Sequence, residues 1–306
     1  MVNQAKIHKL FLITIGVMIA AHLSFVLYRN LNPVQNSKIS ETYRPQGSSA
    51  KAFGLVLPQE RHFSVGSVRE LDATFKKCGF DLQKAKSAGT APRLYLSKLP
   101  TDMGKKTRAS NTTFIRVLLP HILKVNEEIS HDRTKLLALQ KRLKAGGHLR
   151  QTEKRWLVKL KTEYRCPSTK IEALLVHVDV VPPSLALSQA MIETGGGRSS
   201  AAIRKNSTFG HMRTKTKVEK FESLHANVKA YVINLNRHAA YKPFRLARAK
   251  MRANDKKLCG YTLASGLQKY SVRGTAYIRD VQRQIDAHGL KGYDHITLEE
   301  HLRMKP

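Results

Sequence analysis

The stretch from Val181 to Ala202 reads VPPSLALSQAMIETGGGRSSAA. Pro182 and Pro183 favour the first turn of a helix, because the N–H group that proline lacks has no partner there. Gly195 follows at the place where a residue in the left-handed conformation ends a helix. The pattern therefore predicts one short helix with a single acid, Glu193, in its last turn.

The position of Glu193 predicts a carboxyl group that keeps its proton. The carbonyl end of a helix opposes ionisation, and apolar neighbours such as Met191 and Ile192 raise the carboxyl pKa further. A carboxylic acid that is protonated near neutral pH can protonate a glycosidic oxygen as it leaves. The three glycines after it would let a bulky ligand approach the backbone in an open groove. A solvated surface glutamate is the alternative interpretation of the same spacing.

The run from Pro182 to Gly195 resembles the catalytic-helix motif of the glucosaminidase domain in bacterial Bax-type proteins. These are relatives of the flagellar and autolytic N-acetylglucosaminidases that cut peptidoglycan. The resemblance continues in the family's order through RLYLSKLP at 93–100, LLPHILKVNEE at 118–128, YVINLNRHAAY at 231–241, FRLARA at 244–249 and YSVRGTAY at 270–277. It implies a mainly α fold (α+β at most), lysozyme-like, with a groove between lobes. It also implies an endo-β-N-acetylglucosaminidase that hydrolyses β-1,4 bonds of peptidoglycan next to N-acetylglucosamine.

The resemblance and the residue chemistry together select a set of candidate site residues. The expected catalytic residues are Glu193 as general acid, Tyr270 and Glu222. The expected substrate-binding residues are Gln189, Gly195, Gly196, Phe209, Tyr231 and Asn234. For Tyr231, packing in the core is the preferred interpretation.

The second catalytic group is the least defined part of this site. Hydrolysis of a glycosidic bond normally uses a second carboxylate, as nucleophile or as base for water. Family relatives carry a longer lobe after the Phe-Gly pair, and some have an acid in it. Here the segment from Phe209 to Glu219 is short and basic, so Glu219 and Glu222 are the available candidates for the second carboxylate. For each of them, a solvated surface carboxylate is the alternative interpretation.

Two departures from the family pattern keep a second function open. The family usually has an aromatic residue at the position of Gly196, and the lobe after Phe209 is short. A degenerate member that binds peptidoglycan in the cell envelope without cutting it is therefore the alternative.

Composition indicates an anionic partner, which could be nucleic acid, an anionic membrane or a wall polymer with peptide carboxylates, and the amino terminus helps to choose among them. The chain has 54 Lys and Arg against 22 Asp and Glu, a formal net charge of +32, and 42% hydrophobic residues, which is enough for a packed core. Residues 10–28 are largely apolar and approach the roughly 20 residues that cross a bilayer as a helix. Lys6 and Lys9 precede them, which predicts a cytoplasmic start, and no clear cleavage site follows. We expect a single-pass protein of the bacterial inner membrane with its C-terminal domain in the periplasm, where nucleic acid is a poor partner.

The expected organisation has six parts: a cytoplasmic start (1–9), a transmembrane signal-anchor helix (10–28), a flexible linker (29–55), a helical N-terminal region (56–165), the glucosaminidase-like domain (166–295) and a tail (296–306). Apolar spacing and capping residues predict helices over 68–77, 113–129 with a bend at Pro120, 132–143, from 152 onward, 171–178, 223–239, 262–270 and 274–287, and a helix start at 297. The helices before residue 166 are expected to form a hairpin that frames the groove.

Metal and cofactor chemistry find no support in the sequence. Cys78, Cys166 and Cys259 have no Cys-x-x-Cys spacing, so no metal knuckle is expected and at most one disulfide can form. The histidines show no His-Glu-x-x-His pair, and the glycine run at 195–197 follows a helix where a phosphate loop would precede one. We therefore expect neither a cofactor nor a metal.

Overall fold

The computed structural model describes residues 60–105, 110–214 and 216–300. The predicted cytoplasmic start, transmembrane helix and linker lie outside the described residues, as does the end of the predicted tail. Within the described ranges, every helix is too short or too polar to cross a lipid bilayer.

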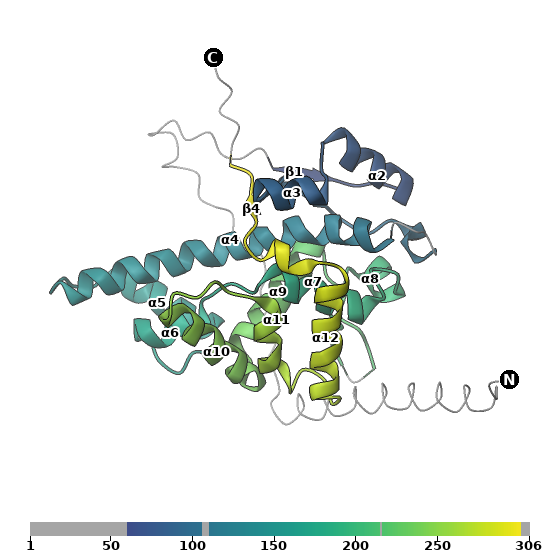
Figure 1. Cartoon of the computed structure of the whole chain (residues 1–306). Helices are drawn as coiled ribbons and strands as arrows, with labels where there is room; N and C mark the ends of the chain where they lie inside the picture. Colours follow the sequence, from purple (N-terminus) through teal and green to yellow (C-terminus); the bar gives the residue numbers. More distant parts are fainter. Residues whose placement is uncertain (1–59, 106–109, 215, 301–306) are drawn as a thin grey trace, which may run out of the picture.

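The molecule is mainly α, as predicted, and is built around one long helix, α4 (Ser110–Lys144), that runs across it (Figure 1). The short elements before α4 lie on one side of it in this view, and most helices of the later chain lie on the other. The elements before α4 are β1 (Arg61–Phe63), α2 (Val68–Lys77), α3 (Leu82–Ala88), β2 (Thr90–Ala91), β3 (Leu94–Leu96) and η2 (Thr101–Gly104). Those after it are α5 (Gln151–Glu163), α6 (Ile171–His177), α7 (Pro183–Thr194), α8 (Ser200–Lys205), α9 (Leu224–Arg237), η3 (Ala239–Tyr241), α10 (Lys242–Ala253), α11 (Gly260–Leu263), η4 (Ala264–Leu267), α12 (Thr275–Ala287), η5 (Leu290–Tyr293) and β4 (Thr297–Leu298).

Helix α4 joins two helices that the sequence predicts as separate. The apolar side continues through Val125, Ile129, Leu136 and Leu139, all buried, so the chain has no reason to break before Asp132. The predicted start at Asp132 is therefore wrong, and Pro120 lies inside the same helix. The hairpin itself is confirmed, because α5 folds back on α4 and the Arg142 guanidinium pairs with Glu153 across the turn. Within it Leu157 and Leu160 are buried and Trp156 is partly exposed beneath Lys135.

Two tiny parallel sheets occur in the described residues, and one of them ties residues 297–298 to residues 90–91. Strand β1 pairs with β3, and β2 pairs with β4. The amide of Thr297 donates to the Gly89 carbonyl at 3.0 Å, and the amide of Glu299 donates to Ala91 at 2.9 Å. The helix predicted to begin at Thr297 is therefore wrong, because pairing with a distant strand outweighs the local capping signal. Helix 262–270 is likewise replaced by the short α11 and η4.

Helix α7 lies in the core, and distant residues hold its first turn. Asp294 accepts hydrogen bonds from the amide of Ser184 at 2.8 Å, from its hydroxyl at 2.8 Å and from the amide of Gly260 at 2.9 Å. The Asp294 carboxylate therefore lies at the positive end of α7, where it satisfies amides that have no partner inside the helix. This arrangement fixes the start of the helix that carries Glu193.

The segment before α7 is held by the buried Arg248 of the stretch FRLARA and by Arg252, which follows that stretch. Arg248 is fully buried and donates to the carbonyls of Asp179 and Val180 at 3.0 and 2.9 Å. The buried Asp179 carboxylate accepts two hydrogen bonds from Arg252, at 2.8 and 3.1 Å. These contacts give Arg248 and Arg252 a structural role, because they hold the chain that leads into α7.

Candidate functional site

Glu193 lies in the last turn of α7, as predicted, and the helix ends at Gly195 in the left-handed conformation. The residue as a whole is partly exposed, while its carboxyl group is buried. Its Oε1 accepts a hydrogen bond from the hydroxyl of Tyr277 at 3.1 Å. The carboxyl group is therefore held by α12 from one side.

Burial raises the pKa of Glu193 to about 7, although the hydrogen bond from Tyr277 lowers it. A carboxyl group with this pKa is protonated in a large fraction of molecules at neutral pH. The direction agrees with the prediction from the sequence, which named the apolar surroundings as one cause. Such a group can both donate a proton and stay as a carboxylate after donating it.

Gln189 lies one turn before Glu193 and is fully buried. Its Oε1 accepts a hydrogen bond from Tyr231 at 2.7 Å, and its Nε2 donates to the hydroxyl oxygen of Tyr277 at 3.0 Å. The expectation that Gln189 contacts substrate is therefore wrong, because its amide has no exposed surface and both ends bind tyrosines. Its contacts lie behind the acid instead.

Two pairs of stacked rings flank the acid. Tyr231 stacks on Phe209 with 3.9 Å between ring centres, and Tyr270 stacks on Tyr277 at 5.4 Å. Tyr231 and Phe209 are buried at 1% and 3% exposure, so core packing of Tyr231 is confirmed and a sugar-facing ring of Phe209 is not observed. Tyr270 is partly exposed, and its hydroxyl donates to the Phe209 carbonyl at 3.4 Å.

The glycines after Glu193 have unequal surroundings, although all three have positive φ. Gly195 is exposed, whereas Gly196 and Gly197 are buried. A Cβ atom at 197 would lie 2.5 Å from the Phe114 ring, and one at 196 would collide with the Asn111 side chain. Gly196 and Gly197 therefore allow close packing against α4, which corrects the expectation that they open the backbone to a ligand.

Gly210 is a site residue that the sequence did not single out. It has φ +65°, and a Cβ atom there would lie 3.0 Å from Oε2 of Glu193. The segment that carries it is anchored by the buried Asn227, whose Oδ1 accepts from the amide of Thr208 at 2.8 Å and from its hydroxyl at 2.5 Å. Gly210 therefore lies directly beside the second carboxyl oxygen, at a place where a side chain would crowd it.

Tyr277 is the other contact that was missed. Both Tyr277 and Gly210 lie in stretches that the sequence already marked, YSVRGTAY and the Phe-Gly pair. Those stretches indicated the region, but nothing local showed which side chains reach the acid.

The remaining predicted positions lie outside the hydrogen-bonded group around Glu193. Met212 and Val218 form a single antiparallel bridge, which agrees with a short lobe. Glu222 is exposed and Glu219 is partly exposed. No side-chain hydrogen bond joins either of them to Glu193 among the described residues. Asn234 is partly exposed on α9, and its role in substrate binding stays a prediction.

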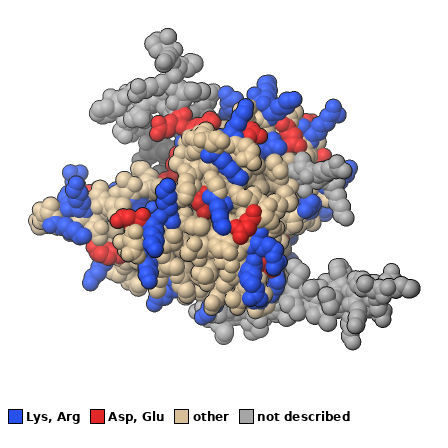
Figure 2. Space-filling view, viewed as in Figure 1, with Lys and Arg blue, Asp and Glu red and all other residues tan. Residues whose placement is uncertain are grey.

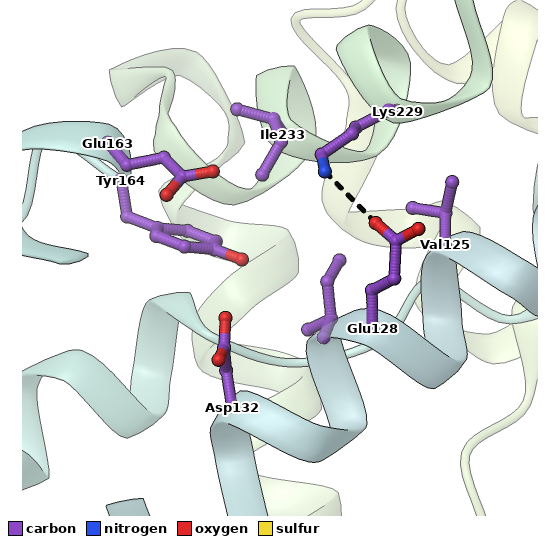
Figure 3. A pocket seen from close by; sticks show the side chains of 8 residues that line it. Val125, Glu128, Asp132, Glu163, Tyr164, Lys229 and Ile233 are labelled. Atoms are coloured by element: carbon purple, nitrogen blue, oxygen red, sulfur yellow. Dashed lines mark hydrogen bonds and ion pairs between the residues drawn. The ribbon is translucent and has the colours of Figure 1, made fainter. Parts of the chain in front are cut away.

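A small cavity elsewhere in the molecule is a poor candidate for a sugar site (Figure 3). It encloses about 40 Å³, which is the scale of one or two water molecules. Burial raises the pKa of Asp132 and of Glu163 on its wall, and Lys229 donates to Glu128 at 3.0 Å. Its lining comprises Val125, Glu128, Ile129, Asp132, Glu163, Tyr164, Lys229 and Ile233, none of them from the group around Glu193.

A larger hollow of about 270 Å³ lies beside the residues that come directly after Gly195–Gly197 in the sequence. It is lined by Thr101, Arg198, Ser200, Ile203 and Arg204. Arg198 donates to the Gly195 carbonyl at 2.7 Å, which connects this hollow to the end of α7.

Among the described side chains, no group of three or more His, Cys, Asp or Glu residues is arranged to hold a metal ion. Cys78, Cys166 and Cys259 are free thiols. The chemistry that the site offers is therefore that of one carboxyl group among tyrosine hydroxyls.

Comparisons with known proteins agree with the resemblance. The family model described as mannosyl-glycoprotein endo-beta-N-acetylglucosaminidase matches residues 172–290, which include α7, Gly210 and Tyr277. Protein bax of Escherichia coli (strain K12) is 30% identical over 212 residues, which cover 63% of this chain and 76% of that protein. No solved structure shows a significant match.

Proposed function

The chain belongs to the family of Bax-type proteins with a glucosaminidase domain, and we propose that it is a peptidoglycan hydrolase with Glu193 as its general acid. The bond cut is the β-1,4 glycosidic bond next to N-acetylglucosamine. The observation that carries the proposal is Glu193 itself: at the end of α7, burial of its carboxyl group raises the pKa to about 7.

In the proposed reaction the proton of Glu193 moves to the glycosidic oxygen while the bond from that oxygen to the sugar carbon breaks. The electron pair of that bond goes to the leaving oxygen, and positive charge develops on the sugar ring. Water then adds to the ring carbon and its proton restores the acid. The Tyr277 hydroxyl, already 3.1 Å from Oε1, stabilises the carboxylate that exists between these steps.

Tyr270 is the proposed group that steadies the developing positive charge. It is partly exposed beside Tyr277, and its hydroxyl oxygen has lone pairs to offer. Burial, the neighbouring Tyr277 and the Glu193 carboxylate raise the pKa of Tyr270 well above its ordinary value, so it acts as a neutral hydroxyl. Glu222 remains the alternative second catalytic group. To act in this role, the loop that carries it would have to move towards Glu193.

We also propose that residues 10–28 anchor the protein in the inner membrane and that the hydrolase domain lies in the periplasm. The apolar run after Lys6 and Lys9 supports this topology. Lys and Arg side chains are spread over the face shown in Figure 2, with fewer Asp and Glu between them. Such a surface suits a polymer that carries peptide carboxylates.

The experiment that tests the function uses the full chain in detergent and purified sacculi. The proposal expects soluble muropeptide fragments whose reducing-end sugar identifies the bond cut. The alternative, binding without cutting, expects sedimentation with sacculi and no fragments. One reason for that alternative was that Gly196 replaces an aromatic residue of the family. This reason is weaker than the sequence suggested, because Gly196 is explained by its packing against Asn111.

A further inference from the structure

The side chains behind Glu193 form a hydrogen-bonded chain with a defined direction. Tyr231 donates to Oε1 of Gln189 at 2.7 Å, Nε2 of Gln189 donates to the Tyr277 oxygen at 3.0 Å, and Tyr277 donates to Oε1 of Glu193 at 3.1 Å. All three residues behind the acid are at most 3% exposed, so water does not compete for these groups.

The direction follows from which end of the Gln189 amide faces each tyrosine. A tyrosine hydroxyl has one hydrogen, whereas an amide has a carbonyl that only accepts and an NH₂ group that donates. Because Gln189 already donates to the Tyr277 oxygen, the Tyr277 hydrogen is left to point at Glu193. The same amide turned around would accept the Tyr277 hydrogen and take it away from the acid.

The two oxygens of Glu193 are therefore unequal. Oε1 accepts from Tyr277, so a proton on the carboxyl group belongs on Oε2. Oε2 is the oxygen that faces Gly210, where any side chain would crowd it. A glycosidic oxygen is expected to approach on this side.

We propose that Gln189 is a positioning residue that turns the Tyr277 hydroxyl onto Oε1 of Glu193 and so confines the acid's proton to Oε2, beside Gly210. This proposal rests on the function proposed for Glu193. It gives Gln189 an effect on the reaction without any contact with the substrate.

The test compares Gln189→Met with Tyr277→Phe in the full chain. Methionine has a length close to that of glutamine but cannot donate to Tyr277, so the hydrogen bond from Tyr277 to Glu193 weakens. We expect kcat to fall about tenfold, which corresponds to one hydrogen bond, with KM unchanged. kcat falls as pH rises through the pKa of Glu193. We expect the pH at which it falls to be about half a unit higher in Gln189→Met and about one unit higher in Tyr277→Phe, because the carboxylate loses its hydrogen-bond donor.

Ser188→Ala is the matched control. Ser188 is equally buried on α7 and donates to the Val281 carbonyl at 2.9 Å, but it is not part of the chain to Glu193. We expect it to lower stability and leave the pH profile of kcat in place. If Gln189 had only a structural role, Gln189→Met would likewise lower stability and leave the pH profile of kcat unchanged. An unchanged pH profile in Gln189→Met would therefore overturn the proposal. A rise in KM alone would also overturn it, by placing Gln189 on the substrate.

A second measurement separates this proposal from the function. Titration of the Glu193 carboxyl by ¹³C NMR needs no turnover, and the proposal expects its pKa to be higher in Gln189→Met than in the unchanged chain. If sacculi are not cut but the titration shifts, the function is wrong and the positioning role stands. If sacculi are cut and the titration does not shift, the positioning role is wrong and the function stands.

Discussion

Tyr277 reaches Glu193 from 84 residues further along the chain, and its hydroxyl lies 3.1 Å from the carboxyl Oε1. Two helices meet at this contact: α7, which ends directly after the acid, and α12, which packs along it. The contact gives the acid one fixed oxygen and leaves the other for chemistry. The behaviour of the site therefore depends on both helices keeping their positions.

The pH dependence of the reaction follows from the protonated form of Glu193 being the active one. Since burial raises its pKa to about 7, we expect kcat on sacculi to fall about tenfold per pH unit well above pH 7. Initial rates of fragment release from pH 5 to 9 measure this. A rate that rises through pH 7 would mean that Glu193 does not act as the acid.

Stability should depend on pH through the same group. The pKa of Glu193 is about 7 in the folded chain against an ordinary value of 4.5, so the folded state holds this proton more tightly. Its stabilising effect is complete below pH 4.5 and is lost as pH rises to about 7, by roughly 2–3 kcal/mol. Urea unfolding at pH 5 and pH 8 should show this loss in the unchanged chain and not in Glu193→Gln. Equal pH dependence in both would contradict it.

Gly210→Ala should block the reaction while the fold survives. The added methyl group would lie 3.0 Å from Oε2 of Glu193, where the leaving oxygen is expected. Gly79→Ala is the matched control, because Gly79 has φ +66° against +65° at Gly210 and no atom within 4 Å of its added Cβ. Both variants should lose about 1 kcal/mol of stability from backbone strain. Only Gly210→Ala should lose fragment release, and equal activity of the two would remove Gly210 from the site.

Asp294→Ala should destabilise the domain by about 2–4 kcal/mol. The change removes three hydrogen bonds at the start of α7 and α11 and leaves buried amides without partners. Thermal unfolding checks the size of the effect. Glu299→Ala is a suitable control, since this carboxylate is exposed and only its backbone takes part in strand pairing. A stability loss no larger than in the control would show that α7 does not depend on this cap.

The sequence predicted the parts of the site that local signals define. Prolines before a helix and a glycine after it act within a few residues, so the bounds of α7 and the place of Glu193 could be predicted. The pKa direction also followed, because α7 is apolar around the acid.

The parts of the site that could not be predicted from the sequence depend on contacts between distant segments. Tyr270 and Tyr277 come from the same marked stretch, and only packing of α12 on α7 decides that Tyr277 binds the acid. Gln189 has the residue type of a sugar-binding group, but tertiary packing buries it completely. Asp132 has the type of a helix cap but lies inside α4, because the apolar pattern continues past it.

The most direct test of the whole account is fragment release from sacculi by Glu193→Gln, with the products identified by mass spectrometry. Glutamine keeps the shape of the side chain but has no acidic proton, so release should fall by at least about a hundredfold while thermal unfolding at pH 5 stays near that of the unchanged chain. Fragments released at the unchanged rate by this variant would contradict the central claim, because the proton would then come from another group.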